Sequence, residues 1–136
     1  MWILDNLELF ASLSSDEKKS LEIFCQMRTL SNWEILFKEW EDASSLYIVK
    51  SWKLQAFTYS WILWDIEKDW FVWEMALFSE PQKKRMASVK SISDDTNVIV
   101  MLYFSLIELE KKHPLIMEKI KNIVSKRVEE NKNKWL

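Results

Sequence analysis

One segment of this chain carries the residue types that could bind an anion. Residues 71–78 are apolar without the alternation of an exposed strand, residues 79–85 are polar and end in the basic run 83–85, and a strand-like pattern resumes over 86–89. The change of pattern predicts a short helical turn between two strands. The N-terminus of such a turn offers free backbone N–H groups to an anion. Without further support, Glu74 and the basic run would be read as solvated surface charges.

No catalytic constellation is found elsewhere in the sequence. Cys25 is the single cysteine, which excludes an internal disulfide and fits a reducing compartment, and its apolar surroundings predict a buried, inert thiol. His113 stands alone before Pro114, so it predicts neither a metal site nor a Ser-His-Asp triad. A Walker-type phosphate loop is also missing. We therefore expect a protein that is not an enzyme and needs no metal or cofactor.

Composition narrows the classes of partner. The 136 residues suit one domain, and 19 basic against 21 acidic side chains give a net charge of −2, which predicts no bulk attraction to nucleic acid or to an anionic membrane. The N-terminus lacks the pattern of a signal peptide, and no stretch approaches the roughly 20 apolar residues of a membrane span. We expect a cytoplasmic protein.

The chain contains nine Trp and no Gly, whereas ordinary chains have roughly 7% Gly. Several of the Trp follow Asn, Ser or Asp between apolar runs, where Gly would complete a turn dipeptide. We therefore interpret the nine Trp as standing at glycine positions. The interpretation predicts turns or bulges, several with positive φ, at most of Trp33, Trp40, Trp52, Trp61, Trp64, Trp70 and Trp73.

Two origins would explain such a pattern: a gene whose UGA codons specify glycine, or deliberate substitution. The alternative is a genuinely Trp-rich chain with a large aromatic core or a face that stacks on carbohydrate or bases. Trp in a core would follow strand or helix periodicity, and here it follows the turns. A bulky residue at positive φ costs about 1–3 kcal/mol, so the chain with Trp should be marginally stable.

Around the anion-binding segment, the pattern predicts helix, antiparallel β-structure and two helices, over 1–30, 31–104 and 105–136. Ser14 and Glu17 form a capping box that opens a helix through about Met27. Five short apolar runs predict a β-sandwich or barrel: 34–37, 46–49, 54–57, 87–89 and 98–101. The last two helices are expected over 105–112 and 115–133, with a stripe of Ile116, Ile120, Ile123, Val124 and Val128.

With glycine read at position 73, Val72-Trp73-Glu74-Met75-Ala76-Leu77 followed by Arg85-Met86-Ala87-Ser88-Val89 resembles the phosphate-binding cassette of the cyclic nucleotide-binding domain family. This family includes catabolite-activator-like proteins and the regulatory subunits of protein kinase A. The similarity extends to residues 9–14, 32–41 and 45–52, which resemble the family's opening, first hairpin and central strand pair. It implies an α+β, mainly β fold: an antiparallel jelly-roll β-barrel flanked by an N-terminal helix and two C-terminal helices.

The resemblance also implies a ligand site in the cassette over 71–89. Glu74 would accept a hydrogen bond from the ribose 2′-hydroxyl, and the Arg85 guanidinium would meet the cyclic phosphate. Backbone N–H groups of 74–76 would complete the anion site, and position 73 must let the backbone approach the ligand closely. Met86 stands where guanine-preferring members have a hydroxyl, which favours cAMP over cGMP. The implied ligand-binding residues are Trp73, Glu74, Met75, Ala76, Arg85, Met86 and Ala87.

We therefore expect a cyclic nucleotide-binding regulatory module without a DNA-binding, kinase or channel domain of its own. Its output would be a protein partner in trans, or the chain would be a fragment of a longer regulator. The alternative is a structural domain that keeps the barrel, binds no nucleotide and forms a homodimer through the stripe on the last helix.

Overall fold

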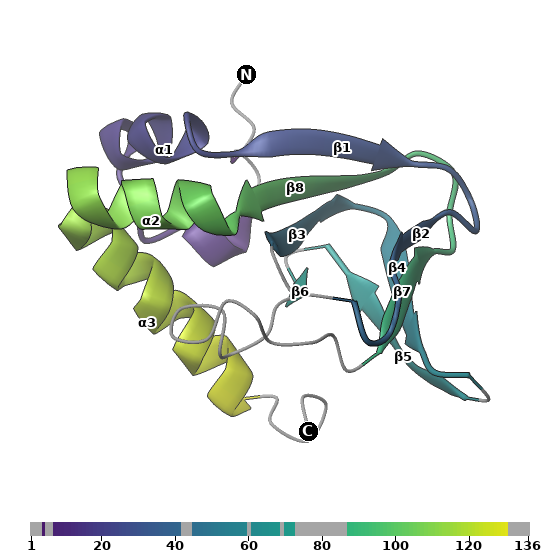
Figure 1. The fold of residues 1–136 in the computed structure, drawn as a ribbon. Coiled ribbons are helices and arrows are strands. Elements are labelled where there is room, and N and C mark those ends of the chain that lie inside the picture. Colours follow the sequence, from purple (N-terminus) through teal and green to yellow (C-terminus); the bar gives the residue numbers. More distant parts are fainter. Residues whose placement is uncertain are drawn as a thin grey trace.

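The computed structural model describes residues 4, 7–41, 45–59, 61–68, 70–72 and 87–130. Helices lie at both ends of this part of the chain and strands fill its middle (Figure 1), which confirms the α+β class. The helices are the 3₁₀ helix η1 (Glu8–Phe10), α1 (Ser15–Glu22), α2 (Tyr103–Lys112) and α3 (Pro114–Glu130). The strands are β1 (Gln26–Leu30), β2 (Ile35–Phe37), β3 (Ser45–Ser51), β4 (Lys53–Phe57), β5 (Ile62–Glu67), β6 (Phe71–Val72), β7 (Ser88–Ser91) and β8 (Thr96–Leu102).

The strands of the described residues form two antiparallel sheets, ordered β1-β8-β3-β6 (sheet A) and β2-β7-β4-β5 (sheet B). The pairing is nested, because β1 pairs with β8, β2 with β7, β3 with β6 and β4 with β5. Additional pairs between β3 and β8 and between β4 and β7 complete the two sheets. This nested arrangement of two packed sheets is that of a jelly roll, as the resemblance implied.

The first helix is shorter than the sequence predicted. It ends at Glu22 rather than near Met27, because the backbone turns there: the Phe24 N–H donates to the Leu21 carbonyl oxygen at 2.9 Å and the Cys25 N–H to that of Glu22 at 3.1 Å. The following residues then form β1 against β8. Pairing across the sheet therefore replaces the last predicted helical turn.

The C-terminal helices lie close to their predicted positions. Helix α2 begins at Tyr103, two residues before the predicted start, and α3 begins at Pro114 rather than at Leu115. Proline suits the first position of a helix because its missing N–H would have no helical partner there. Helix α3 is described as far as Glu130, so the predicted end near residue 133 lies outside the described residues.

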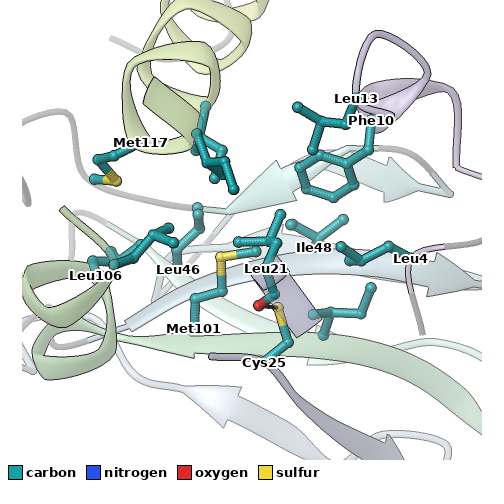
Figure 2. Close-up of a cluster of buried hydrophobic side chains, with 14 of the residues drawn as sticks. Leu4, Phe10, Leu13, Leu21, Cys25, Leu46, Ile48, Met101, Leu106 and Met117 are labelled. Atoms are coloured by element: carbon teal, nitrogen blue, oxygen red, sulfur yellow. Dashed lines mark hydrogen bonds between the residues drawn. The ribbon is translucent and has the colours of Figure 1, made fainter. Parts of the chain in front are cut away.

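Two buried clusters hold the fold together, one on each face of sheet A. The helix-side core packs η1, α1, α2 and α3 onto β3 and β8 (Figure 2). The inter-sheet core lies between the two sheets. Strand β8 contributes Ile99 and Met101 to the first and Val98 and Val100 to the second. Burial on both faces explains why this strand is a continuous apolar run rather than an alternating one.

The apolar stripe predicted on the last helix is largely part of the helix-side core. Ile116, Ile120 and Val124 are buried there and Ile123 packs against it. The side chain of Val128 lies outside the described residues. The stripe therefore packs mainly against the chain's own helices and sheet.

The backbone at the Trp positions was predicted to resemble glycine, and this is confirmed at three of them. Trp33, Trp40 and Trp52 have φ values of 70°, 74° and 64°. Trp61 closes the β4–β5 hairpin, where its N–H donates to the Thr58 carbonyl oxygen at 3.3 Å. Trp70 precedes β6 outside any strand.

Trp64 lies within β5 opposite Ala56, directly beside the β-bulge or irregularity at which the β4–β5 register shifts. This position agrees with the predicted choice between a turn and a bulge. Trp2, Trp73 and Trp135 lie outside the described residues.

Candidate functional site

The predicted site lies on the segment between β6 and β7. We call residues 73–86 the cassette segment. Trp73, Glu74, Met75, Ala76, Arg85 and Met86 lie in it and are outside the described residues. Ala87, the remaining predicted site residue, is half-buried and directly precedes β7. The structure therefore describes how the two ends of the segment are held.

The chain enters the cassette segment from the edge of sheet A. Strand β6 pairs with β3, where Val72 lies opposite Tyr47. Just before it, the Trp70 carbonyl oxygen accepts the Val49 N–H at 2.8 Å, and the Trp70 N–H donates to the Glu67 carbonyl oxygen at 3.0 Å. These backbone hydrogen bonds hold the chain in place directly before the cassette segment.

The chain leaves the cassette segment into the interior of sheet B, where β7 lies between β2 and β4. Its first residue, Ser88, is buried and lies opposite Phe57. The Ser88 Oγ accepts the backbone N–H of Glu39 at 2.8 Å. The hydroxyl therefore joins the β2–β3 connection to the strand that follows the site.

The sequence predicts site residues as far as Ala87 and does not single out Ser88. The available signal was a small hydroxyl side chain at the start of an apolar strand, where a buried oxygen must find a hydrogen-bond partner. The partner is a backbone group 49 residues away, which a single sequence does not reveal.

A stacked aromatic pair joins the two sheets beside the ends of the segment. The rings of Phe37 and Tyr47 have centroids 5.8 Å apart and an interplanar angle of 27°. Phe37 on β2 lies opposite Val89 of β7, and Tyr47 on β3 lies opposite Val72 of β6. The pair thus links the neighbour of β6, the strand before the segment, with the neighbour of β7, the strand after it. The sequence analysis did not identify this pair either.

Charges near β7 in the described residues are engaged locally. The Lys90 Nζ lies 4.3 Å from the ring centroid of Trp33 and 4.9 Å from that of Phe57. At the β1–β2 turn, the Ser31 N–H lowers the pKa of the Glu34 carboxyl, and Arg28 at 3.3 Å lowers it further. These contacts stabilise the region around the β1–β2 turn.

Neither a metal site nor a membrane-spanning helix is found in the part of the chain that the structure covers. Its His, Cys, Asp and Glu side chains form no group able to hold a metal ion. Within the same residues, none of the helices combines the length and apolar character needed to cross a membrane.

No family model matches the sequence, and no curated protein matches it. Solved structures match the fold. A protein from Geobacter metallireducens named as cyclic nucleotide-binding aligns over 90% of this chain and 89% of its own, with a TM-score of 0.73 and 16% identity. The chain has the fold of the cyclic nucleotide-binding domains. PfPKA-R with cAMP bound aligns over 94% of this chain and 42% of its own, with a TM-score of 0.73 and 20% identity. The regulatory subunit of a cAMP-independent protein kinase A from Trypanosoma brucei aligns over 91% of this chain and 42% of its own, with a TM-score of 0.73 and 12% identity.

The names of these structures show that the cyclic nucleotide-binding fold alone does not decide the ligand. One structure holds cAMP, and another belongs to a kinase that is cAMP-independent. The residues of the cassette segment must therefore carry any argument about binding.

Proposed function

We propose that this chain is a regulatory module that binds a cyclic nucleotide, with cAMP preferred over cGMP. The observation that supports the proposal is the cyclic nucleotide-binding fold itself, together with the chain order: the residues that resemble the phosphate-binding cassette follow β6 of sheet A and precede β7 of sheet B in the sequence. The module acts by binding rather than by catalysis.

In this proposal, two charged side chains recognise the sugar and the phosphate. Glu74 accepts a hydrogen bond from the ribose 2′-hydroxyl, and the planar Arg85 guanidinium donates to the anionic oxygens. The backbone N–H groups of 74–76 add donors at the start of a helical turn. Met86 offers no hydroxyl to guanine, which is the reason for the preference for cAMP.

Binding would be transmitted to a protein partner through the C-terminal helices. Strand β8 runs directly into α2, and α2 and α3 share the helix-side core with β3, which pairs with β6. A ligand that binds one packing of these helices better than another shifts the population between them. The partner would act in trans.

The alternative is a barrel that binds no nucleotide and forms a homodimer through the last helix. It has less support, because Ile116, Ile120 and Val124 of the stripe are buried within the same chain. A second copy would find little of the stripe exposed.

The test is calorimetry with cAMP and cGMP on a protein in which glycine replaces the Trp residues. We expect Arg85→Ala to weaken cAMP binding by about 1.5–3 kcal/mol, because it removes a charge-assisted contact to phosphate. Glu74→Ala should also weaken binding. Lys84→Ala, which removes the same charge one position away, is the matched control and should bind as the parent protein does.

Unchanged affinity in Arg85→Ala would show that the cassette assignment is wrong. A parent protein that binds neither nucleotide would favour the alternative. A thermal shift gives an independent readout, since a ligand at 100 times its Kd stabilises the folded state by about 2.7 kcal/mol.

Position 73 has its own test within the same series. An indole there would occupy the space in which the backbone approaches the ligand, so the all-Trp chain should bind cAMP far more weakly than the all-glycine chain. Trp73→Gly alone should restore only part of the affinity. Equally tight binding by the all-Trp chain would contradict this expectation.

A further inference from the structure

The residues with positive φ all lie in the same kind of connection. Among the described residues they are Trp33, Trp40, Trp52 and Asp95. Each lies in a connection that takes the chain from one sheet to the other: β1 to β2, β2 to β3, β3 to β4 and β7 to β8. Asp tolerates the left-handed region because its short polar side chain can hydrogen-bond locally, whereas a bulky side chain there is an outlier.

The first two of these corners are built in the same way. In the turn 31–34, the Glu34 N–H donates to the Ser31 carbonyl oxygen at 3.0 Å, and the Ser31 N–H donates to the Glu34 Oε1 at 3.1 Å. In the turn 38–41, Glu41 and Lys38 repeat both hydrogen bonds at 3.2 and 3.1 Å. The Trp stands third in each turn.

The second residues of these turns, Asn32 and Glu39, are not among those with positive φ in the described chain. A positive φ at the third position alone is the pattern of a type II turn, which calls for glycine there. Trp52 is the single residue between β3 and β4, so the whole change of sheet falls on its backbone.

The indoles at these corners contribute little packing to the fold. Trp33, Trp40 and Trp52 are 63%, 73% and 64% exposed, so none belongs to an aromatic core. The corners also lie apart: the Trp33 N–H donates to the Ser91 carbonyl oxygen, at the end of β7, and the corner of Trp40 is held at Ser88, where β7 begins. Because these two corners lie at opposite ends of β7, Trp33 and Trp40 do not form a single face for stacking.

We propose that positions 33, 40 and 52 are glycine positions, and that the protein made in its own host carries glycine there. The proposal rests on the corners of the fold and is independent of nucleotide binding. Replacing Trp by Gly at each corner should remove strain and raise the ratio of folded to unfolded protein by a factor of about 5–30.

The first test compares two triple variants, Trp33→Gly/Trp40→Gly/Trp52→Gly and Trp33→Ala/Trp40→Ala/Trp52→Ala. Both remove the same three indoles, but only glycine also removes the Cβ that disfavours positive φ. Denaturant unfolding should be followed by far-UV circular dichroism, because the variants differ in Trp fluorescence. We expect the glycine variant to unfold at a clearly higher denaturant concentration than the alanine variant.

Equal midpoints for the glycine and alanine variants would overturn the proposal, even if the unsubstituted chain fails to fold. Asp95→Gly is the control at the fourth corner, where the native residue already tolerates the conformation. If Asp95→Gly raised the denaturant midpoint as much as a Trp-to-Gly replacement does, the stabilisation would not be specific to the Trp positions.

The second test is the intact mass of the protein purified from its own host. If one codon assignment underlies the three corners, all nine Trp positions share it, and the mass should be lower than that of the printed sequence by the difference between nine Trp and nine Gly residues. A mass equal to that of the printed sequence would overturn the proposal.

Discussion

The thiol of Cys25 lies just past the end of α1, and its Sγ donates to the Leu21 carbonyl oxygen at 3.5 Å. Burial raises the pKa of this thiol to about 12, and the nearby Glu22 carboxylate contributes to the rise. Because the thiolate is the reactive form, very little of the nucleophile exists at neutral pH. The residue therefore packs as a small apolar side chain in the helix-side core.

We expect Cys25 to resist alkylation in the folded protein at pH 7 and to react fully in denaturant. The measurement is the mass gain after iodoacetamide treatment with and without denaturant. Cys25→Ala serves as the control for modification at other residues. Rapid labelling of the folded protein would show that this part of the core opens easily.

At the scale of single residues, local rules carried most of the predictive power. The capping box at Ser14 and Glu17 is present as predicted, with both of its hydrogen bonds. The positive φ at three Trp positions followed from turn chemistry. Ser88 was missed, because its role depends on a backbone group distant in the chain.

Among the helices, Glu17 links α1 to α3. Its carboxylate completes the capping box of α1 and accepts two hydrogen bonds from the Lys119 Nζ on α3, at 2.7 and 2.9 Å. The bond from Lys119 is the largest cause of a lowered pKa at Glu17, and the Ser14 N–H adds to it. One side chain therefore links α1 to α3.

The lowered pKa predicts a specific dependence of stability on pH. A carboxyl whose pKa is lower in the folded than in the unfolded state stabilises the fold above its ordinary pKa of about 4.3, and this stabilisation is lost as the pH falls through the folded pKa. We expect Glu17→Gln to lose less stability than the parent protein on acidification from pH 6 to pH 3. The measurement is the denaturant midpoint at each pH.

Lys119→Gln should flatten the same profile, because it removes the main cause of the shift. If the parent protein and Glu17→Gln showed parallel profiles, the pairing would have no energetic role.

At the scale of elements, the sequence revealed strands that contain an apolar run and missed β1, which is defined by pairing. Strand β8 was predicted from its apolar run. Strand β1 was not, because four of its five residues are exposed and it is held in place by β8. Tertiary pairing overrides weak local preference in such a strand. The edge strand β6 was also missed, because its two residues are too few to show a period along the chain.

For the molecule as a whole, the burial of the α3 stripe predicts that it stabilises the monomer. Ile120 is 1% exposed, so Ile120→Ala should destabilise the fold by about 2–4 kcal/mol through the cavity that it leaves. Ile23→Ala is the matched control, because Ile23 is 80% exposed and should change stability by less than about 0.5 kcal/mol. Denaturant unfolding measures both.

Light scattering on the same samples reports the oligomeric state. If Ile120→Ala converted a dimer to a stable monomer, the stripe would be an interface and its packing within one chain would need revision.

The order of helices and strands was accessible from sequence because it depends on composition and period along the chain. The partners of each strand were not, since they depend on contacts between distant residues. The jelly-roll pairing came from resemblance, and the structure bears it out.

Nested pairing also has a consequence for synthesis. Gln26 in β1 lies opposite Val100 in β8, so the first strand must wait for the last to be translated. At roughly 5–20 residues per second, this delay is on the order of ten seconds. The β4–β5 hairpin can close early on the ribosome, while the backbone groups of β1 stay without their final partner. Growing chains of this protein therefore expose an unpaired strand for most of their synthesis, when a chaperone would be of most use to them.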